Sequence, residues 1–288
     1  MPRSTTKSSI SIAIIGAGTF ATALARALRR HRYRITEIIS RDNPDSLRRA
    51  RALGKAVGAK AASVHNARFS AKVSWLCVPD DAVSSVAHEL SVRGDWLRKL
   101  VIHSSGALGS DVLAPVKQAG AEVASAHPLM TFVSGSRAEL TGVPFAMEGD
   151  PKALAIAGAV VRSLGAKPFR IAAQFKPAYH LFGFFSSPAV VALIAAAQQV
   201  GTLAGLSDRR ARELMEPIVR QTIDNCFRST PQAAFSGPLR RGDAATIRKH
   251  LSVLREEPEL LAVYTALARI AFQRLPVGNR DQLRKLIG

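Results

Sequence analysis

The chain has 288 residues, of which 47% are hydrophobic, and it contains only two cysteines. This length allows one large or two medium domains, and the low cysteine content excludes a disulfide scaffold and favours a reducing compartment. The formal net charge of +19 makes nucleic-acid binding a hypothesis to weigh. We favour a basic solvated surface, because the sequence shows no helix-turn-helix, zinc finger or aromatic RNA-binding motif. It also shows no Cys and His cluster with metal-ligand spacing, so we expect no metal.

The first predicted elements are a strand, a glycine turn and a helix. Residues 10–15 form an apolar run that breaks into the sequence G-x-G-x-x-A, and apolar residues at helical spacing follow. In a Rossmann unit the first glycine makes the tight turn, the second lets a pyrophosphate approach the backbone, and the small third residue allows close helix packing. We therefore predict that a dinucleotide binds at this helix N-terminus, through Gly16, Gly18, Thr19, Phe20 and Ala21.

The end of the second predicted strand, residues 33–39, indicates which dinucleotide is preferred. An NAD site usually carries Asp or Glu there, which accepts a hydrogen bond from the ribose 2′-OH. This chain has Ser40 and Arg41, and an arginine can hold a 2′-phosphate through bidentate charge-assisted bonds. We therefore predict NADP(H) as the cofactor. Asp42 keeps the NAD alternative open, because it would compete if the strand ended a residue or two later.

Strand and helix patterns alternate through the rest of the first half of the chain. The apolar run at residues 73–78 is typical of a strand covered on both faces, and we expect Val78 and Pro79 at its end to contact the cofactor. Asp80 and Asp81 are predicted to cap a helix over residues 82–90. We expect a further helix at 45–53 and further short strands at 61–64, 100–102, 122–126, 144–148 and 168–171. Together they predict a doubly wound, mainly parallel sheet.

The alternation ends at about residue 173, and long helical patterns take over. We predict an NADP-binding Rossmann domain over residues 1–172 and an all-helical substrate and dimerisation domain over residues 173–288. The second domain begins with a long helix over 177–203, kinked at Pro188, in which residues 178–200 include no Asp, Glu, Lys or Arg. Further helices are predicted at 208–222, 244–255 and 259–273.

The charge-free helix is predicted to be buried rather than to span a membrane. Such a helix has no solvent face, so we expect helices of its own subunit and of a second subunit to cover it, which predicts a homodimer. The first nine residues are polar, with Arg3 and Lys7, and the apolar run after them is too short for a secretory core. We therefore expect a cytoplasmic protein without a signal peptide.

Four motifs in the chain point to one bacterial protein family. They are His103-Ser104-Ser105-Gly106-Ala107 and the segments 126–132 (AHPLMTF), 144–150 (PFAMEGD) and 237–243 (GPxxRGD). In these motifs the chain resembles a family that pairs a Rossmann-like domain with a C-terminal domain of unknown function. Its domain order resembles that of the 6-phosphogluconate and β-hydroxyacid dehydrogenases, to which pyrroline-5-carboxylate and ketopantoate reductases are related. The resemblance implies a dinucleotide-linked reductase with a helical domain like that of 6-phosphogluconate dehydrogenase, and it names no substrate.

Reduction of a C=O or C=N bond by hydride needs a proton donor for the developing anion. Lys176 precedes the long predicted helix, and Tyr179 and His180 follow on roughly one face. The superfamily resemblance implies a catalytic lysine here with an Asn about one turn beyond, but this chain has no such Asn. We predict that Lys176 and His180 are catalytic and that Tyr179 binds substrate. A surface lysine at a domain junction and a histidine packed in an apolar helix stay open as alternatives.

Two loops after predicted strands carry further candidates, since open α/β sheets bind ligands at the carboxyl ends of their strands. We expect Ser105 to act in catalysis by holding a substrate carboxylate or the nicotinamide ribose, and His103 and His127 to bind substrate. His127 and the proline after it also resemble a substrate-binding site in prephenate dehydrogenases. Hydrogen bonding within the loops is the alternative for both histidines. Arg241, in a turn before the helix at 244–255, is the substrate-binding candidate of the helical domain.

These observations predict an NADP-dependent oxidoreductase that transfers hydride to or from a small anionic oxo-, imino- or hydroxy-acid. The direction of the reaction stays open, and so does a deazaflavin as the hydride partner. The missing Asn favours an alternative function, a non-catalytic NADP-binding sensor or regulatory protein of the same fold. A nucleic-acid-binding protein is the third class, and a steep dependence of affinity on salt would distinguish it.

Overall fold

The computed structural model describes residues 10–133 and 139–288, so the first nine residues, for which we expected no signal peptide, lie outside the described part. The described chain divides into two compact units, and the division falls after Pro188. The sequence predicted a boundary at residue 172 instead. The difference arises because the helix that begins at Lys176 buries two of its side chains, Lys176 and Tyr179, and their hydrogen-bond partners belong to the first unit.

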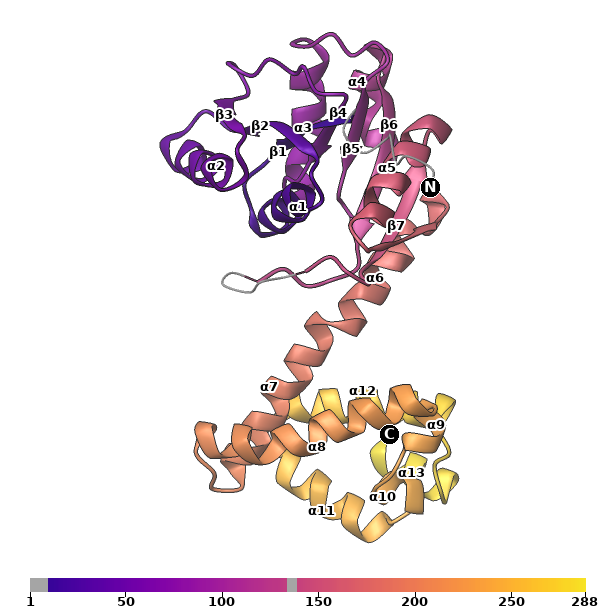
Figure 1. Ribbon diagram of the computed structural model, residues 1–288. Helices are drawn as coiled ribbons and strands as arrows, with labels where there is room; N and C mark the ends of the chain where they lie inside the picture. Colours follow the sequence, from indigo (N-terminus) through magenta and orange to yellow (C-terminus); the bar gives the residue numbers. More distant parts are fainter. Residues whose placement is uncertain (1–9, 134–138) are drawn as a thin grey trace, which may run out of the picture. The chain divides into compact units, whose positions relative to one another are not determined.

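The first unit contains a sheet whose described strands lie in the order β3-β2-β1-β4-β5-β6-β7-β8 (Figure 1). Neighbouring strands are parallel except for β6 and β7, which are antiparallel. The strands are β1 Ser11–Ile15, β2 Arg34–Ser40, β3 Lys60–Ser63, β4 Val73–Leu76, β5 Leu100–His103, β6 Glu122–Pro128, β7 Pro144–Gly149 and β8 Lys167–Arg170. Each lies within two residues of its predicted bounds, and the predicted Rossmann-like fold is confirmed.

Helices cover both faces of this sheet (Figure 1). One apolar core joins the sheet to α1, α2 and α5, and a second core joins the opposite face to α3, η1 and α4. The helices are α1 Thr19–Arg30, α2 Pro44–Val57, α3 Asp80–Ser91, the 3-10 helix η1 Ser110–Leu113, α4 Ala114–Gln118 and α5 Pro151–Ser163. Because β1, β4 and β5 are covered on both sides, their sequences are nearly continuous apolar runs. This packing fixes the carboxyl edge of the sheet, where the candidate site lies.

The chain after β8 is helical throughout its regular elements, as predicted. These are η2 Ala173–Phe175, α6 Lys176–Ser186, α7 Pro188–Leu203, α8 Asp208–Arg228, α9 Pro231–Ala234, α10 Pro238–Arg241, α11 Ala244–Leu254, α12 Pro258–Arg274 and α13 Arg280–Ile287. A small core that includes Ile247, Phe272 and Leu283 joins α11, α12 and α13. Asp243 caps α11 by accepting a hydrogen bond from the backbone N–H of Thr246 at 3.0 Å.

The long apolar helix predicted over residues 177–203 is two helices. α6 ends at Ser186 and α7 begins at Pro188, because the proline ring disfavours the helical conformation at the preceding residue. Ser187 accordingly has φ −139° and ψ −74°. No side chain of α7 is buried by the described chain, and Val191 is 65% exposed. The second subunit that we expected to cover this helix stays a prediction.

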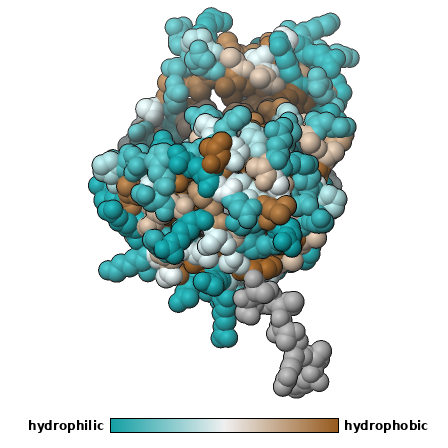
Figure 2. All heavy atoms as spheres, turned by 90° about the horizontal axis from the view of Figure 1, so that it is seen from above, coloured by the Kyte–Doolittle hydropathy of each residue, from teal (hydrophilic) through white to brown (hydrophobic). Residues whose placement is uncertain are grey.

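The stretch Ala173–Leu203, which contains α6 and α7, is long and apolar enough to cross a membrane by length and composition, with a mean hydropathy of 1.7. One such stretch is weak evidence for a membrane protein, because the core helix of a soluble protein has the same composition. The view from above in Figure 2 shows mainly hydrophilic side chains, with apolar groups both singly and gathered together among them.

Candidate active site

The glycine turn after β1 is tied to both neighbouring strands. The N–H of Gly16 donates to the carbonyl of Ile39 at 2.7 Å, and the N–H of Cys77 donates to the carbonyl of Ile15 at 2.7 Å. Gly16 has φ +115°, and a Cβ atom there would lie 2.3 Å from the carbonyl oxygen of Cys77. Only glycine fits this position, because its backbone conformation and its close approach to the next strand both exclude a side chain.

Gly18 differs from Gly16, because a Cβ atom on it would meet nothing within 4 Å and its φ is −82°. It is the N-cap of α1, and no side chain caps the helix. The first N–H groups of α1 are therefore available to an anion beside an open backbone. Ala21 is fully buried, and the Phe20 ring packs against Phe132 with centroids 5.0 Å apart. This cradle fits the pyrophosphate of a dinucleotide.

Ser40 and Arg41 lie where the sequence placed them, at the end of β2. Ser40 is buried and its hydroxyl donates to the carbonyl of Arg41 at 3.2 Å, whereas the Arg41 side chain is exposed. Asp42 is exposed as well. Pro79 follows Val78 after β4, and the Cγ1 of Val78 lies 3.5 Å from the position of a Cβ on Gly16. The predicted cofactor residues thus gather at the carboxyl ends of β1, β2 and β4.

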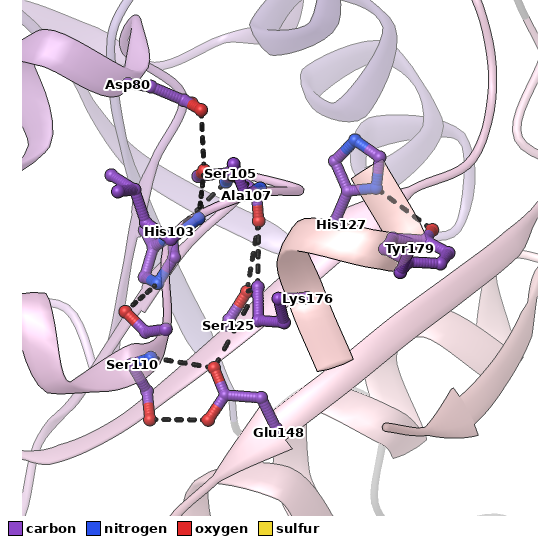
Figure 3. Close-up of polar contacts among 12 residues, drawn as sticks. Asp80, His103, Ser105, Ala107, Ser110, Ser125, His127, Glu148, Lys176 and Tyr179 are labelled. Atoms are coloured by element: carbon purple, nitrogen blue, oxygen red, sulfur yellow. Dashed lines mark hydrogen bonds and ion pairs between the residues drawn. The ribbon is translucent and has the colours of Figure 1, made fainter. Parts of the chain in front are cut away.

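Ser105 organises the loop that follows β5 (Figure 3). Its hydroxyl donates to Oδ2 of Asp80 at 2.8 Å and accepts from the N–H groups of Ala107 at 3.2 Å and Leu108 at 2.9 Å. The prediction that Asp80 caps a helix was wrong: α3 begins at Asp80, Pro79 is its N-cap, and no side chain caps it. The Asp80 carboxylate instead ties the start of α3 to the Ser105 loop.

His103 is fully buried inside the same loop. The N–H of Ser105 donates to its Nδ1 at 3.2 Å, so Nε2 carries the proton and donates to the carbonyl of Gly109 at 3.1 Å. Burial lowers the pKa of His103 to about 3, and the charge of Lys176 acts in the same direction. The neutral ring therefore holds the loop together, which is the alternative that the sequence left open for this histidine.

Lys176 is the first residue of α6, and its side chain is 1% exposed. Its Nζ donates to the carbonyl of Ser105 at 3.0 Å and to the hydroxyl of Ser125, and it lies 3.8 Å from Oε1 of Glu148. The same carboxylate accepts from the N–H and the hydroxyl of Ser110, both at 2.7 Å (Figure 3). The ammonium group thus joins the loop after β5 to the strands β6 and β7.

Burial also lowers the pKa of Lys176, to about 8, although the carboxylates of Glu148, Asp80 and Asp111 oppose the shift. Its side chain has almost no access to solvent. Lys176 therefore has a structural role, because its buried ammonium group holds Ser105, Ser125 and Glu148 together. It does not present an accessible proton donor to a substrate in this arrangement.

His127 and Tyr179 form a second pair at the sheet edge. His127 Nδ1 lies 3.0 Å from the Tyr179 hydroxyl, and the ring planes are nearly perpendicular. Burial lowers the pKa of His127 to about 4 and raises that of Tyr179 to about 12, so both groups are neutral at neutral pH. A Cβ on Gly106 would lie 2.8 Å from His127 Nε2, so the absence of a side chain at Gly106 leaves room for the His127 ring. The exposed ring of His180 lies 6.5 Å from that of His127.

The first unit thus brings together Ser105, His127 and Tyr179 with the buried His103 and Lys176. Arg241 ends α10 in the second unit, where it is exposed. The sequence analysis missed Ser125 and Glu148, which are polar partners of Lys176, and Ser110, which donates to Glu148. An acidic residue within the otherwise apolar strand β7 is the one local signal that pointed to Glu148. Among residues 10–133 and 139–288 no His, Cys, Asp and Glu group could hold a metal ion.

Comparison with known protein families agrees with this architecture. Residues 3–128 match the family model of a Rossmann-like domain, and residues 143–271 match that of a domain of unknown function, DUF2520. The chain pairs a Rossmann-like domain with a DUF2520 domain. The family resemblance inferred from the four sequence motifs is therefore confirmed. A search of the curated proteins found no match.

Solved structures share the fold over almost the whole chain. BF3122 of Bacteroides fragilis, assigned as an NADP oxidoreductase, is 24% identical, with a TM-score of 0.77 over 92% of this chain and 98% of its own. An imine reductase from Myxococcus stipitatus in complex with NADP+ is 16% identical, with a TM-score of 0.65 over 96% and 99%. A pyrroline-5-carboxylate reductase from Coxiella burnetii is 17% identical, with a TM-score of 0.57 over 92% and 98%. These similarities show a common fold.

Proposed function

We propose that the chain is an NADP(H)-dependent oxidoreductase that transfers hydride to or from a small anionic oxo-, imino- or hydroxy-acid. The observation that carries this proposal is the open cradle at Gly18, on the same sheet edge as Ser105, His127 and Tyr179. The NADP oxidoreductases among the structural neighbours support it, and the net charge of +19 favours an anionic substrate.

The residues of the first unit fit the proposed cofactor. When bound, NADP(H) supplies or accepts the hydride. The turn from Gly16 to Thr19 would hold its pyrophosphate, and Arg41 would hold the 2′-phosphate that distinguishes NADP from NAD. Val78 and Pro79 would line the site at the end of β4. The fit rests on the open space at Gly18 and on the uncapped N-terminus of α1.

For the proton, we propose the pair of Tyr179 and His127 in place of Lys176. Tyr179 keeps its proton at neutral pH and can give it to the anion that develops on the substrate during reduction. His127, with its proton on Nδ1, then donates a hydrogen bond to the phenolate oxygen and stabilises it. In the oxidative direction the same phenolate takes the proton back. His180, exposed beside this pair, stays an alternative donor.

One observation favours a second candidate function, a non-catalytic NADP(H) sensor or regulatory protein. Lys176, which the superfamily resemblance implies as catalytic, is buried and engaged with Ser105, Ser125 and Glu148. A sensor needs the cradle at Gly18 but no proton donor. Turnover therefore separates the two functions, because only an enzyme consumes NADPH.

The experiment measures NADPH consumption by the full chain with a panel of small oxo- and imino-acids. We expect turnover with at least one of them, and Tyr179→Phe should lower kcat by roughly 100-fold or more because it removes the proton donor. Tyr264→Phe is the matched control, since Tyr264 also pairs with a histidine, His250, but in the second unit. Tight NADPH binding without any turnover would establish the sensor instead. Full activity of Tyr179→Phe would exclude the proposed donor.

We further propose that the protein is a cytoplasmic homodimer that neither spans a membrane nor binds nucleic acid. Exposed apolar side chains on α7, α8 and α12 support a second copy as the partner of this surface. They include Val191, Leu193, Leu214, Ile218 and Leu267. Apolar surface of this extent is typical of obligate interfaces.

A further inference from the structure

The first unit has a pocket of about 570 Å³ that the proposed function does not use. Its walls come from Ser110 at the start of η1, from residues 148–150 at the end of β7 and from residues 170–173 at the end of β8. None of the residues proposed to hold NADP(H) or to carry the proton lines it. The volume of this β7–β8 pocket lies in the range of small-molecule sites.

Two carboxylates line the β7–β8 pocket. That of Glu148 accepts from the N–H and the hydroxyl of Ser110, both at 2.7 Å, and lies 3.8 Å from Nζ of the buried Lys176 (Figure 3). That of Asp150 accepts from Nζ of Lys117 at 2.6 Å and from a backbone N–H at 2.9 Å. An ionised carboxylate has about four lone-pair sites, so both groups can accept a further hydrogen bond from a ligand.

Arg170 supplies the positive charge of the pocket lining. The two carboxylates are paired with lysines, whereas over the described ranges 10–133 and 139–288 no ion pair is found for Arg170, whose side chain is exposed. The Cα of Arg170 is the partner of the Cα of Met147, the residue before Glu148, so the basic and acidic groups come from neighbouring strands. A free guanidinium group can hold the carboxylate of a ligand through two parallel hydrogen bonds.

The two signs of charge in the lining decide the kind of ligand. An anion without a hydrogen-bond donor would bind Arg170 but would face the carboxylates of Glu148 and Asp150. A simple cation would bind the carboxylates but would face Arg170, and the ammonium groups of Lys176 and Lys117 lie behind those carboxylates. A zwitterion meets a group of opposite charge at both of its ends, and it adds no net charge to the pocket.

The rest of the lining is small and apolar. Ile171 is half-buried, and Ala172 and Ala173 are exposed beside it. These side chains offer contacts to an aliphatic group and no polar atoms to a hydroxyl or amide group. The ligand therefore combines a zwitterionic head with a short aliphatic part.

We propose that the β7–β8 pocket binds an aliphatic α-amino acid. Its ammonium group donates to Glu148 and Asp150, its carboxylate accepts from Arg170, and its side chain packs against Ile171 and Ala172. An α-amino acid carries both charged groups on one carbon atom, which suits acidic and basic groups on neighbouring strands about 4.8 Å apart. The site is separate from the proposed hydride transfer and does not depend on it.

Calorimetric titration of the full chain with L-leucine tests the proposal. We expect saturable binding with one site per chain. 4-Methylpentanoate, which lacks the ammonium group, and 3-methylbutylamine, which lacks the carboxylate, should each bind more weakly by roughly ten-fold or more, because each leaves one sign of charge in the pocket without a partner. Absence of saturable L-leucine binding, or equal binding of 4-methylpentanoate, would overturn the proposal.

Arg170→Gln should lower the affinity for L-leucine by roughly ten-fold or more, because it removes the partner of the carboxylate. Arg162→Gln is the matched control, since it makes the same change at an exposed arginine of α5 outside the pocket, and its affinity should stay within about two-fold of the native value. Equal losses in the two variants would show general attraction to a basic protein and would refute the site.

A second pair of variants tests the place of the ligand without changing the charge. Ala172→Phe puts a ring in the pocket at an exposed position, so it should abolish L-leucine binding. Ala114→Phe makes the same change at an exposed residue of α4 outside the pocket and should bind L-leucine as the native protein does. Denaturant unfolding of both variants checks that they fold. Native affinity in folded Ala172→Phe would place the amino acid elsewhere and contradict the proposal.

Discussion

Nζ of Lys176 lies 3.8 Å from Oε1 of Glu148, and the two side chains are only 1% and 9% exposed. This buried ion pair connects the first residue of α6 to β7, and hydrogen bonds extend it to the loop after β5 and to the middle of β6. Removing one partner of such a pair leaves a buried charge without compensation, whereas removing both leaves none. The pair therefore predicts a specific pattern of stability in single and double variants.

Lys176→Met should lower the free energy of unfolding by about 3–5 kcal/mol, because Glu148 stays buried without its cation. The double variant K176M/E148Q should recover most of this loss, since the glutamine oxygen can still accept from the N–H of Ser110 and its NH2 group can donate to the Ser110 hydroxyl. Denaturant unfolding of the native protein and the variants measures the pattern. If the double variant were as unstable as the single one, the structural role of the Lys176–Glu148 ion pair would be excluded.

The two glycines of the dinucleotide turn should respond differently to the same substitution. Gly16→Ala should destabilise the protein by roughly 2–3 kcal/mol, because its Cβ would collide with the carbonyl of Cys77 at a positive φ. Gly18→Ala should leave the free energy of unfolding within about 1 kcal/mol of the native value, since its Cβ meets nothing. The same variant should lose NADPH affinity at least roughly ten-fold, because the methyl group occupies the cradle. Unchanged NADPH affinity of Gly18→Ala would locate the pyrophosphate elsewhere.

Acid should destabilise the fold through His103. Its pKa is about 3 in the folded protein and 6.5 in an unfolded chain, so below pH 6.5 only the unfolded state gains the proton. The free energy of unfolding should therefore fall as the pH falls, by about 2 kcal/mol between about pH 7 and about pH 5 from this residue, and His127 acts in the same direction.

Denaturant unfolding at the two pH values measures this effect. His103→Gln should weaken the pH dependence, and His88→Gln, which changes an exposed histidine of α3, should not. A pH dependence that is the same in native protein and His103→Gln would contradict the assignment of a buried neutral imidazole.

The Rossmann-like unit was readable from the sequence because its signals are local. Strand β1 and the turn through Gly16 and Gly18 are encoded within a dozen residues. The buried strands can be predicted because each is a nearly continuous apolar run. Pro188 also indicated where the apolar helical stretch changes direction, although the structure breaks it into two helices there. Shorter helices such as α9, α10 and α13 lack long periodic patterns, and the sequence did not predict them.

The candidate site was less readable, because its contacts join distant parts of the chain. Lys176 at the start of a helix resembled an accessible catalytic group, but its partner Ser125 lies 51 residues away in sequence and Ser105 lies 71 residues away. The Tyr179 contact with His127 spans 52 residues. Helical and strand periodicities describe one element at a time, so they cannot show which side chains a folded sheet edge brings together.

The homodimer proposal predicts a particle of twice the chain mass of 30.8 kDa in light scattering at micromolar concentration. Val191→Glu should favour the monomer, because it places a charge on the apolar face of α7. Val92→Glu is the matched control, since Val92 is 82% exposed in the first unit, and it should leave the dimer intact. A soluble native monomer would contradict the proposal.

Titration of the protein with NADPH and NADH tests the central claim most directly. The account predicts that the native protein binds NADPH more tightly than NADH, and that Arg41→Ala weakens NADPH binding by about 1.5–3 kcal/mol while it leaves NADH binding unchanged. Arg51→Ala, which removes an exposed arginine of α2, controls for the general charge of the chain and should bind NADPH as the native protein does. Equal affinities of the native protein for the two cofactors, or unchanged NADPH binding by Arg41→Ala, would contradict it.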